Sequence, residues 1–141
     1  MLYTAKEIAN YIVNKCIDDG CPITTLNLQR MLYLVQKNVI NIGRGLAFGD
    51  DIEAWGCGPV VPSVYYYYGR YGAMQITDLV CAPDIMCYDE EILSCIVEKY
   101  EFAKPWDLAK EIVGKDSAWR RNYTNPYSKP IIPIQDIIAY G

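Results

Sequence analysis

Apolar residues near the start of the chain recur at intervals of three and four, the spacing of one face of an α-helix. The positions on this face are Ala5, Ile8, Ala9, Ile12, Val13 and Cys16. Thr4 and Glu7 have the T-x-x-E spacing of a capping box, in which each side chain binds the other's backbone amide. Gly20 and Pro22 are expected to end the run. The pattern predicts an amphipathic helix on a core.

A second apolar stripe predicts a longer helix that begins at Thr24 or Thr25 and is broken by the glycines at 43–45. Its first face carries Leu28, Met31, Leu32, Val35, Val39 and Ile42. A second, amphipathic face carries Gln29, Tyr33, Gln36 and Ile40. Because both faces are patterned, we expect this helix to have neighbours on two sides.

The period of the pattern changes between residues 46 and 61. Residues 46–48 and 52–55 have the length of short strands, and the polar residues 49–51 lie between them as a turn. The sequence therefore predicts a small hairpin here. We also expect Trp55 to pack inward from its strand, with its indole N–H bonded to a partner.

The stretch 53–72, EAWGCGPVVPSVYYYYGRYG, combines turn residues with a run of tyrosines. Gly56 and Gly58 permit backbone angles closed to other residues, while Pro59 and Pro62 fix φ. These four residues predict a rigid corner between a strand and a helix. The corner has neither the nucleophile of a G-x-S-x-G elbow nor the lysine of a P-loop, so it is interpreted chiefly as a fold device.

Pro62 suits the first position of a helix, because its missing amide would have no partner there. Gly72 is expected to close this helix. Helical spacing places Val64, Tyr68 and Tyr71 on one face, and Tyr66, Tyr67 and Arg70 elsewhere. The tyrosine run therefore divides into a core half and a surface half.

Tyrosine and arginine are enriched at binding hot spots, so we predict that Tyr66, Tyr67 and Arg70 bind a partner. The alternative is that one or both tyrosines pack under the C-terminal tail.

The second half of the chain predicts further helices. An acidic turn at 89–91 opens a helix carrying Ile92, Leu93, Ile96, Val97 and Tyr100. Pro105 begins another, and Asp116 with Ser117 can cap a brief helix that holds Trp119. The apolar tail is expected to dock on the body. Together these elements predict a mainly α fold with a small β element (α+β). It would be a compact single-domain helical bundle, residues 1–141, with a short β-hairpin inserted after the second helix.

Composition narrows the possible functions. The net charge of −4 and the absence of a lysine- or arginine-rich block argue against direct nucleic-acid binding, which depends on neutralising phosphates. Charges interrupt every apolar run before the roughly 18 residues that a membrane span needs, so no membrane segment is expected. The start of the chain lacks the basic region and long apolar region of a signal peptide. We therefore expect a cytoplasmic protein.

Candidate chemistry is sparse. The six cysteines include no C-x-x-C pair, and Cys16 and Cys95 are expected to be small buried hydrophobic residues. The chain has no histidine, which removes the usual general base and the commonest metal ligand. We expect no metal, no cofactor and no enzymatic activity. The alternative is an enzyme using Asp50, Asp51 and Glu53 around a metal, but turn chemistry explains these carboxylates better.

Two segments resemble a known family. TTLNLQRMLYLVQ (24–36) and LAFGDDIEAWGCGPVVPSVY (46–65) resemble the Panacea domain, also called SocA-like and found in phage-associated proteins. The first motif falls on Leu28, Gln29, Arg30, Met31, Leu32 and Tyr33. The second falls on Ala54, Trp55, Gly58, Pro59, Val60, Pro62, Val64 and Tyr65. Later segments match more loosely, including the S-x-W around Trp119, so the resemblance spans essentially the whole chain.

The resemblance implies an antitoxin-type module that neutralises a toxin by direct protein contact, or in one subtype by delivering the toxin to a protease. Family members often carry a threonine-histidine pair shortly before the late tryptophan. Here that region reads KEIVGKDSAW without histidine, so no role of that histidine transfers. The alternative function is a phage or mobile-element inhibitor of a host defence protein, such as a nuclease effector. The oligomeric state stays open.

Overall fold

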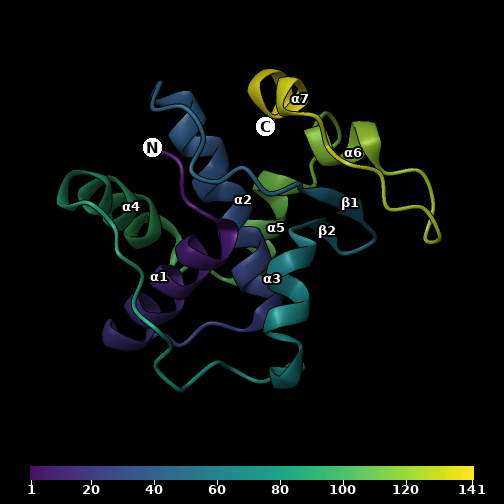
Figure 1. Ribbon diagram of the computed structural model, residues 1–141. Coiled ribbons are helices and arrows are strands. Elements are labelled where there is room, and N and C mark those ends of the chain that lie inside the picture. Colours follow the sequence, from purple (N-terminus) through teal and green to yellow (C-terminus); the bar gives the residue numbers. More distant parts are fainter.

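A computed structural model describes residues 1–141 and places a long central helix among shorter elements (Figure 1). The helices are α1 (Ala5–Asp18), α2 (Thr25–Asn41), α3 (Pro62–Tyr67), the 3₁₀ helix η1 (Gly69–Tyr71), α4 (Cys87–Tyr100), α5 (Pro105–Ile112), α6 (Ala118–Asn122) and α7 (Ile134–Tyr140). The strands are β1 (Glu53–Trp55) and β2 (Gly58–Val60). The predicted fold class, mainly α with a small β element, is confirmed. No helix combines the length and the apolar character that crossing a bilayer requires.

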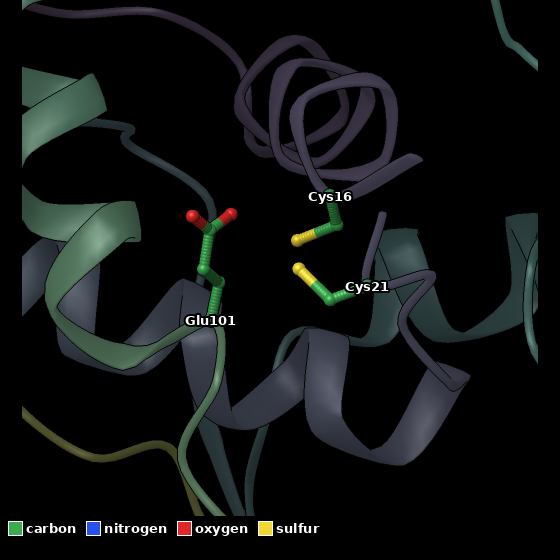
Figure 2. Close-up of side chains that lie close together, drawn as sticks. All are labelled: Cys16, Cys21 and Glu101. Atoms are coloured by element: carbon green, nitrogen blue, oxygen red, sulfur yellow. The ribbon is translucent and has the colours of Figure 1, made fainter. Parts of the chain in front are cut away.

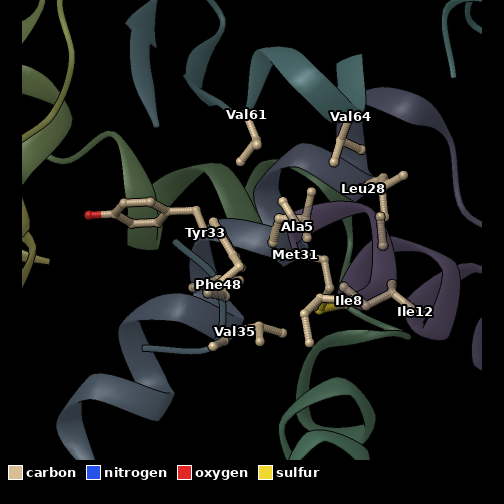
Figure 3. Packing of buried hydrophobic residues seen from close by; sticks show 14 of the residues in the cluster. Ala5, Ile8, Ile12, Leu28, Met31, Tyr33, Val35, Phe48, Val61 and Val64 are labelled. Atoms are coloured by element: carbon tan, nitrogen blue, oxygen red, sulfur yellow. The ribbon is translucent and has the colours of Figure 1, made fainter. Parts of the chain in front are cut away.

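α2 is the central element of the core. It packs against α1, α3, α4, α5, α7 and strand β2. Both of its patterned faces are buried, which confirms the expected neighbours on two sides. Figure 3 shows apolar side chains of α1, α2 and α3 converging with Phe48 and Val61. The placement of Ile42 on the apolar face was wrong. Its side chain is 55% exposed, because α2 ends at Asn41 and Ile42 is the C-cap residue.

Local caps begin several helices where the sequence predicted. The Thr4 hydroxyl accepts a hydrogen bond from the Glu7 amide at 3.1 Å, and the Glu7 carboxylate accepts from the Thr4 amide at 3.0 Å. Thr24 caps α2 and Ser117 caps α6. Proline occupies the first turn of α3 and of α5. Each of these signals depends on neighbouring residues alone, which is why it could be recognised in the sequence.

The hairpin lies later in the chain than predicted. β1 pairs antiparallel with β2 around a tight loop at Gly56 and Cys57, whereas residues 46–48 form only an isolated bridge between Phe48 and Tyr3. The loop is possible because Gly58 has φ +125°, a conformation that L side chains rarely adopt. The expected corner is therefore the hairpin itself, and residues 49–51 are a bend that leads into β1.

The C-terminal tail docks beside β1. The amide of Ala54 donates to the Pro130 carbonyl at 2.8 Å, and the amide of Ile132 donates to the Ile52 carbonyl at 2.7 Å. Ile132 and Ile137 are buried. The tail thus satisfies backbone groups on the outer edge of the hairpin, which would otherwise be exposed as an unpaired strand edge.

Two side chains do not face the way the sequence suggested. Trp55 was expected to pack inward, but Glu53 and Trp55 are two residues apart on a strand and share its outer face, while Ala54 between them is fully buried. The indole N–H of Trp55 does find a partner, the Glu53 carboxylate at 2.9 Å. Cys16 is buried as expected, but Cys95 is exposed because it lies on the solvent side of α4.

Two buried glutamines of α2 attach the segments on either side of the hairpin to the core. The Gln36 amide oxygen accepts from the backbone N–H groups of Ala47 at 2.8 Å and Phe48 at 3.3 Å, and its amide nitrogen donates to the Phe48 carbonyl at 2.8 Å. The Gln29 amide oxygen accepts from the Val61 N–H at 2.8 Å. Buried backbone groups need such partners, because burying them unpaired costs free energy.

Replacing Gln36 tests this attachment. Gln36→Leu leaves two buried N–H groups and a carbonyl unpaired, so we expect the free energy of unfolding to fall by about 2–4 kcal/mol. The matched control is Gln135→Leu, at an exposed position of α7, with an expected change within about 0.5 kcal/mol. Urea unfolding followed by circular dichroism measures both. Equal losses in the two variants would show that Gln36 is not an anchor.

Tyr33 gives a prediction about alkaline pH. Its buried hydroxyl has no hydrogen-bond partner, and burial raises its pKa to about 12. The unfolded chain ionises near the ordinary tyrosine pKa of about 10, so stability is fully present below that pH and is lost as the pH rises towards 12. Between about pH 9 and about pH 11, wild type should lose about 1 kcal/mol more than Tyr33→Phe in urea unfolding. Parallel pH profiles of the two proteins would contradict this.

Candidate protein-binding surface

α3 is held in place by hydrogen bonds to both neighbouring helices. Asp50 connects it to α1, because one carboxylate oxygen accepts from the Ala5 amide at 2.9 Å and the other from the Ser63 hydroxyl at 2.8 Å. The Gln29 bond to Val61 fixes the residue immediately before Pro62. The start of α3 is therefore anchored at two points, and its side chains project in fixed directions.

The inner face of α3 belongs to the core. Val64 and Tyr68 are fully buried, and the Tyr68 hydroxyl donates to Oδ1 of Asn10 at 2.6 Å. Burial raises the pKa of Tyr68, with smaller contributions from the neighbouring Tyr67 and Tyr71. The predicted division of the tyrosine run is confirmed on this side, since Tyr68 lies inside.

The outer face of α3 presents aromatic side chains to solvent. Tyr66 is 68% exposed, Tyr65 41% and Tyr67 36%, and Arg70 is exposed on the following turn. With Trp55 from β1 these residues form a band that we call the tyrosine surface. The structure thus places the three predicted contact residues at the surface and adds Tyr65 and Trp55 beside them. Whether they contact a partner stays a prediction.

Aromatic contacts order part of the tyrosine surface. The rings of Trp55 and Tyr65 meet edge to face with centroids 4.8 Å apart, and those of Tyr65 and Tyr66 meet in the same way at 5.5 Å. Such pairs are favourable beyond the area that they bury. Rings already held by neighbours lose little conformational freedom on binding, which favours their use as rigid contact points.

Cationic side chains lie over the aromatic rings from outside α3. Lys6 of α1 places its Nζ 4.1 Å from the centre of the Tyr67 ring, and Lys129 of the tail places its Nζ 4.1 Å from the centre of the Trp55 ring. Arg70 lies 4.9 Å from the Tyr71 ring. None of the three cations forms an ion pair within the chain. Sequence reasoning missed Lys6 and Lys129, because only folding brings these distant positions to the tyrosines.

The remaining family-motif residues have structural positions. Those fully or almost fully buried are Leu28, Gln29, Leu32, Tyr33, Ala54 and Val60. Gly58 and Pro59 form β2 with Val60, and Pro62 begins α3. Trp119 is half-buried: its indole N–H donates to the Trp55 carbonyl at 2.6 Å and its ring stacks on Tyr123. Trp119 therefore supports β1 from behind the tyrosine surface.

The three carboxylates of the enzyme alternative do not form a cluster that could hold a metal ion. Asp50 uses both oxygens to hold α1 and α3, and Glu53 accepts from the Trp55 indole. Asp51 is exposed in the bend. Two of the three groups thus have defined roles in the fold, although Asp50 bonds to two helices and not within a turn as predicted.

Comparison with known proteins gives one informative similarity. The chain is 34% identical over 83 residues to Antitoxin SocA of Caulobacter vibrioides (strain NA1000 / CB15N). The aligned region covers 58% of this chain and 44% of that protein, so the chain spans less than half the length of this curated relative. No family model matches the chain. No solved structure matches it either.

A pair of matched substitutions tests the division of the tyrosine run. Tyr68→Phe removes a buried hydroxyl and leaves Oδ1 of Asn10 without that donor, so we expect a loss of about 1–3 kcal/mol in the free energy of unfolding. Tyr66→Phe makes the same chemical change at an exposed position and should stay within about 0.5 kcal/mol of wild type. Urea unfolding compares the two. Equal effects would refute the assigned orientation of α3.

Proposed function

We propose that this protein is an antitoxin-type binding module that neutralises a partner toxin by direct protein contact in the cytoplasm, without enzymatic activity of its own. The observation that carries the proposal is the 34% identity with Antitoxin SocA over 83 residues. The Panacea-like motifs at 24–36 and 46–65 agree with it.

The tyrosine surface is the proposed contact face. Tyrosine, tryptophan and arginine dominate the energetics of protein interfaces, because they combine a large contact area with a polar group. Here Tyr66 and Arg70 are exposed, and Trp55 and Tyr65 hold the neighbouring aromatic positions by ring contacts. The bonds from Gln29 and Asp50 keep this face on a fixed support.

The positive charges beside the tyrosine surface indicate which groups the partner's surface carries. The chain carries a net charge of −4, yet Lys6, Arg70 and Lys129 lie on or beside the tyrosine surface without an acidic partner of their own. Carboxylates between apolar side chains on the toxin would complement such a face. Opposite charges in these positions speed encounter and set orientation more than they add affinity.

A growth assay tests the function. Each reading frame next to the gene is induced alone, with this protein, and with its Tyr66→Ala/Tyr67→Ala/Arg70→Ala variant. We expect one neighbour to arrest growth, wild type to restore it, and the variant to fail. A hot-spot residue contributes about 2 kcal/mol or more, so the purified variant should bind the toxin about thirtyfold more weakly, or worse, by calorimetry.

The matched control is Tyr88→Ala/Tyr127→Ala, which removes two exposed tyrosines outside the tyrosine surface and should still rescue. Rescue by the triple variant would contradict the proposed contact face but would leave the proposed antitoxin role standing. The half-life of the toxin during rescue separates masking, which leaves it unchanged, from delivery to a protease, which shortens it. Absence of any toxic neighbour would contradict the proposal and favour the host-defence inhibitor.

A further inference from the structure

Two cysteines and a glutamate meet at one end of the helical core, away from every motif discussed above. The Sγ atoms of Cys16 and Cys21 and a carboxylate oxygen of Glu101 all lie within 4.8 Å of one another. Figure 2 shows the two sulfur atoms facing each other and the Glu101 carboxylate to one side of them. These are ligand types that thiophilic divalent metals bind.

Local structure explains how the three residues come together. Cys16 lies in the last turn of α1, and the chain reverses at Gly20, whose φ of +78° suits glycine. The Cys21 amide then donates to the Cys16 carbonyl at 2.8 Å, which places the second thiol beside the first. Glu101 is the C-cap residue of α4, so the carboxyl end of that helix places it beside the two thiols. The C-x₄-C spacing differs from the C-x-x-C pair sought in the sequence.

No ion pair joins Glu101 to a cation. Cys16 is buried, Cys21 and Glu101 are half-buried, and Oε2 of Glu101 is buried without a hydrogen-bond donor. Lys15, in the same last turn of α1 as Cys16, is already bonded to Asp19 at 3.0 Å and Glu98 at 3.1 Å.

The ends of two helices give the cluster a negative potential. α1 ends at Asp18 and α4 ends at Tyr100, so the carbonyl ends of two helices converge on the cluster. A helix carboxyl end carries a partial negative charge and favours a cation nearby. A disulfide would be neutral and would leave both the helix ends and the Glu101 oxygen without a counter-charge. A bound cation would supply that counter-charge.

The geometry points to a binding site for a thiophilic divalent cation such as Zn²⁺, held by Cys16, Cys21 and Glu101, with a fourth position open to water. Tetrahedral zinc with Zn–S of about 2.3 Å and Zn–O of about 2.0 Å places its ligand atoms about 3.5–3.8 Å apart. Atoms within 4.8 Å reach that spacing by small side-chain rotations. Each thiol gives its proton to solvent on binding. The metal would tie the end of α1 to the end of α4, a role that the sequence did not predict.

Cobalt binding tests this site independently of the antitoxin role. Fully reduced protein, with its thiol content checked by mass, is titrated with Co²⁺. We expect one equivalent to give thiolate-to-cobalt charge-transfer absorption together with the visible bands of a tetrahedral ion, and one equivalent of Zn²⁺ to displace it. Cys16→Ser, Cys21→Ser and Glu101→Gln should each weaken cobalt binding about tenfold or more. The matched control is Cys57→Ser, an exposed thiol outside the cluster, with unchanged binding.

Two results would overturn the proposal. One is a reduced, folded protein that shows no charge-transfer absorption with Co²⁺, and the other is binding that the Cys57→Ser change weakens as much as Cys21→Ser does. Because Cys16 lies in the core, its variant is checked by circular dichroism. If it is unfolded, the decision rests on Cys21→Ser and Glu101→Gln, which alter less buried positions.

Discussion

The hydrogen bonds of two buried amide side chains on α2 position the hairpin and the start of α3. Gln29 and Gln36 are seven residues apart, about two helical turns, so they lie on the same face of the helix. Gln36 holds the segment that enters the hairpin region and Gln29 holds the residue that leaves it. Everything between them, including β1 and β2, is thereby fixed at both ends to the most buried helix of the molecule.

This attachment explains how a run of consecutive tyrosines can be both core and surface. A helix of fixed start and direction has only one face towards α1 and α2, and Tyr68 occupies it with its hydroxyl on Asn10. The adjacent tyrosines must then point outward, where Trp55, Lys6 and Lys129 gather around them. An exposed aromatic band on a rigid support is a costly arrangement for an isolated protein, and it is a useful one for a binding module.

Several buried polar groups serve the fold. Asn10 bonds to Tyr68 and to the Cys81 carbonyl, and Asp89 accepts from the Tyr3 hydroxyl. Gln29 and Gln36 hold backbone amides, as described above. Asparagine, aspartate and glutamine side chains also occur in catalytic sites, but here they bond to other groups of the protein.

The sequence by itself determined most of the helices, because caps and helical periodicity depend on residues within one or two turns. It predicted α7 only as an apolar tail. Thr4 with Glu7, Pro62 and Ser117 all act over such short distances. It also separated Tyr68 from Tyr66, since the helical period decides which residues share a face. The sequence did not predict which distant residues contact one another. The tail that covers β1 at Pro130, and the meeting of Cys16 with Glu101, join positions far apart in the chain. Only the packing of whole elements decides such contacts, and packing also placed the hairpin and turned Trp55 outward.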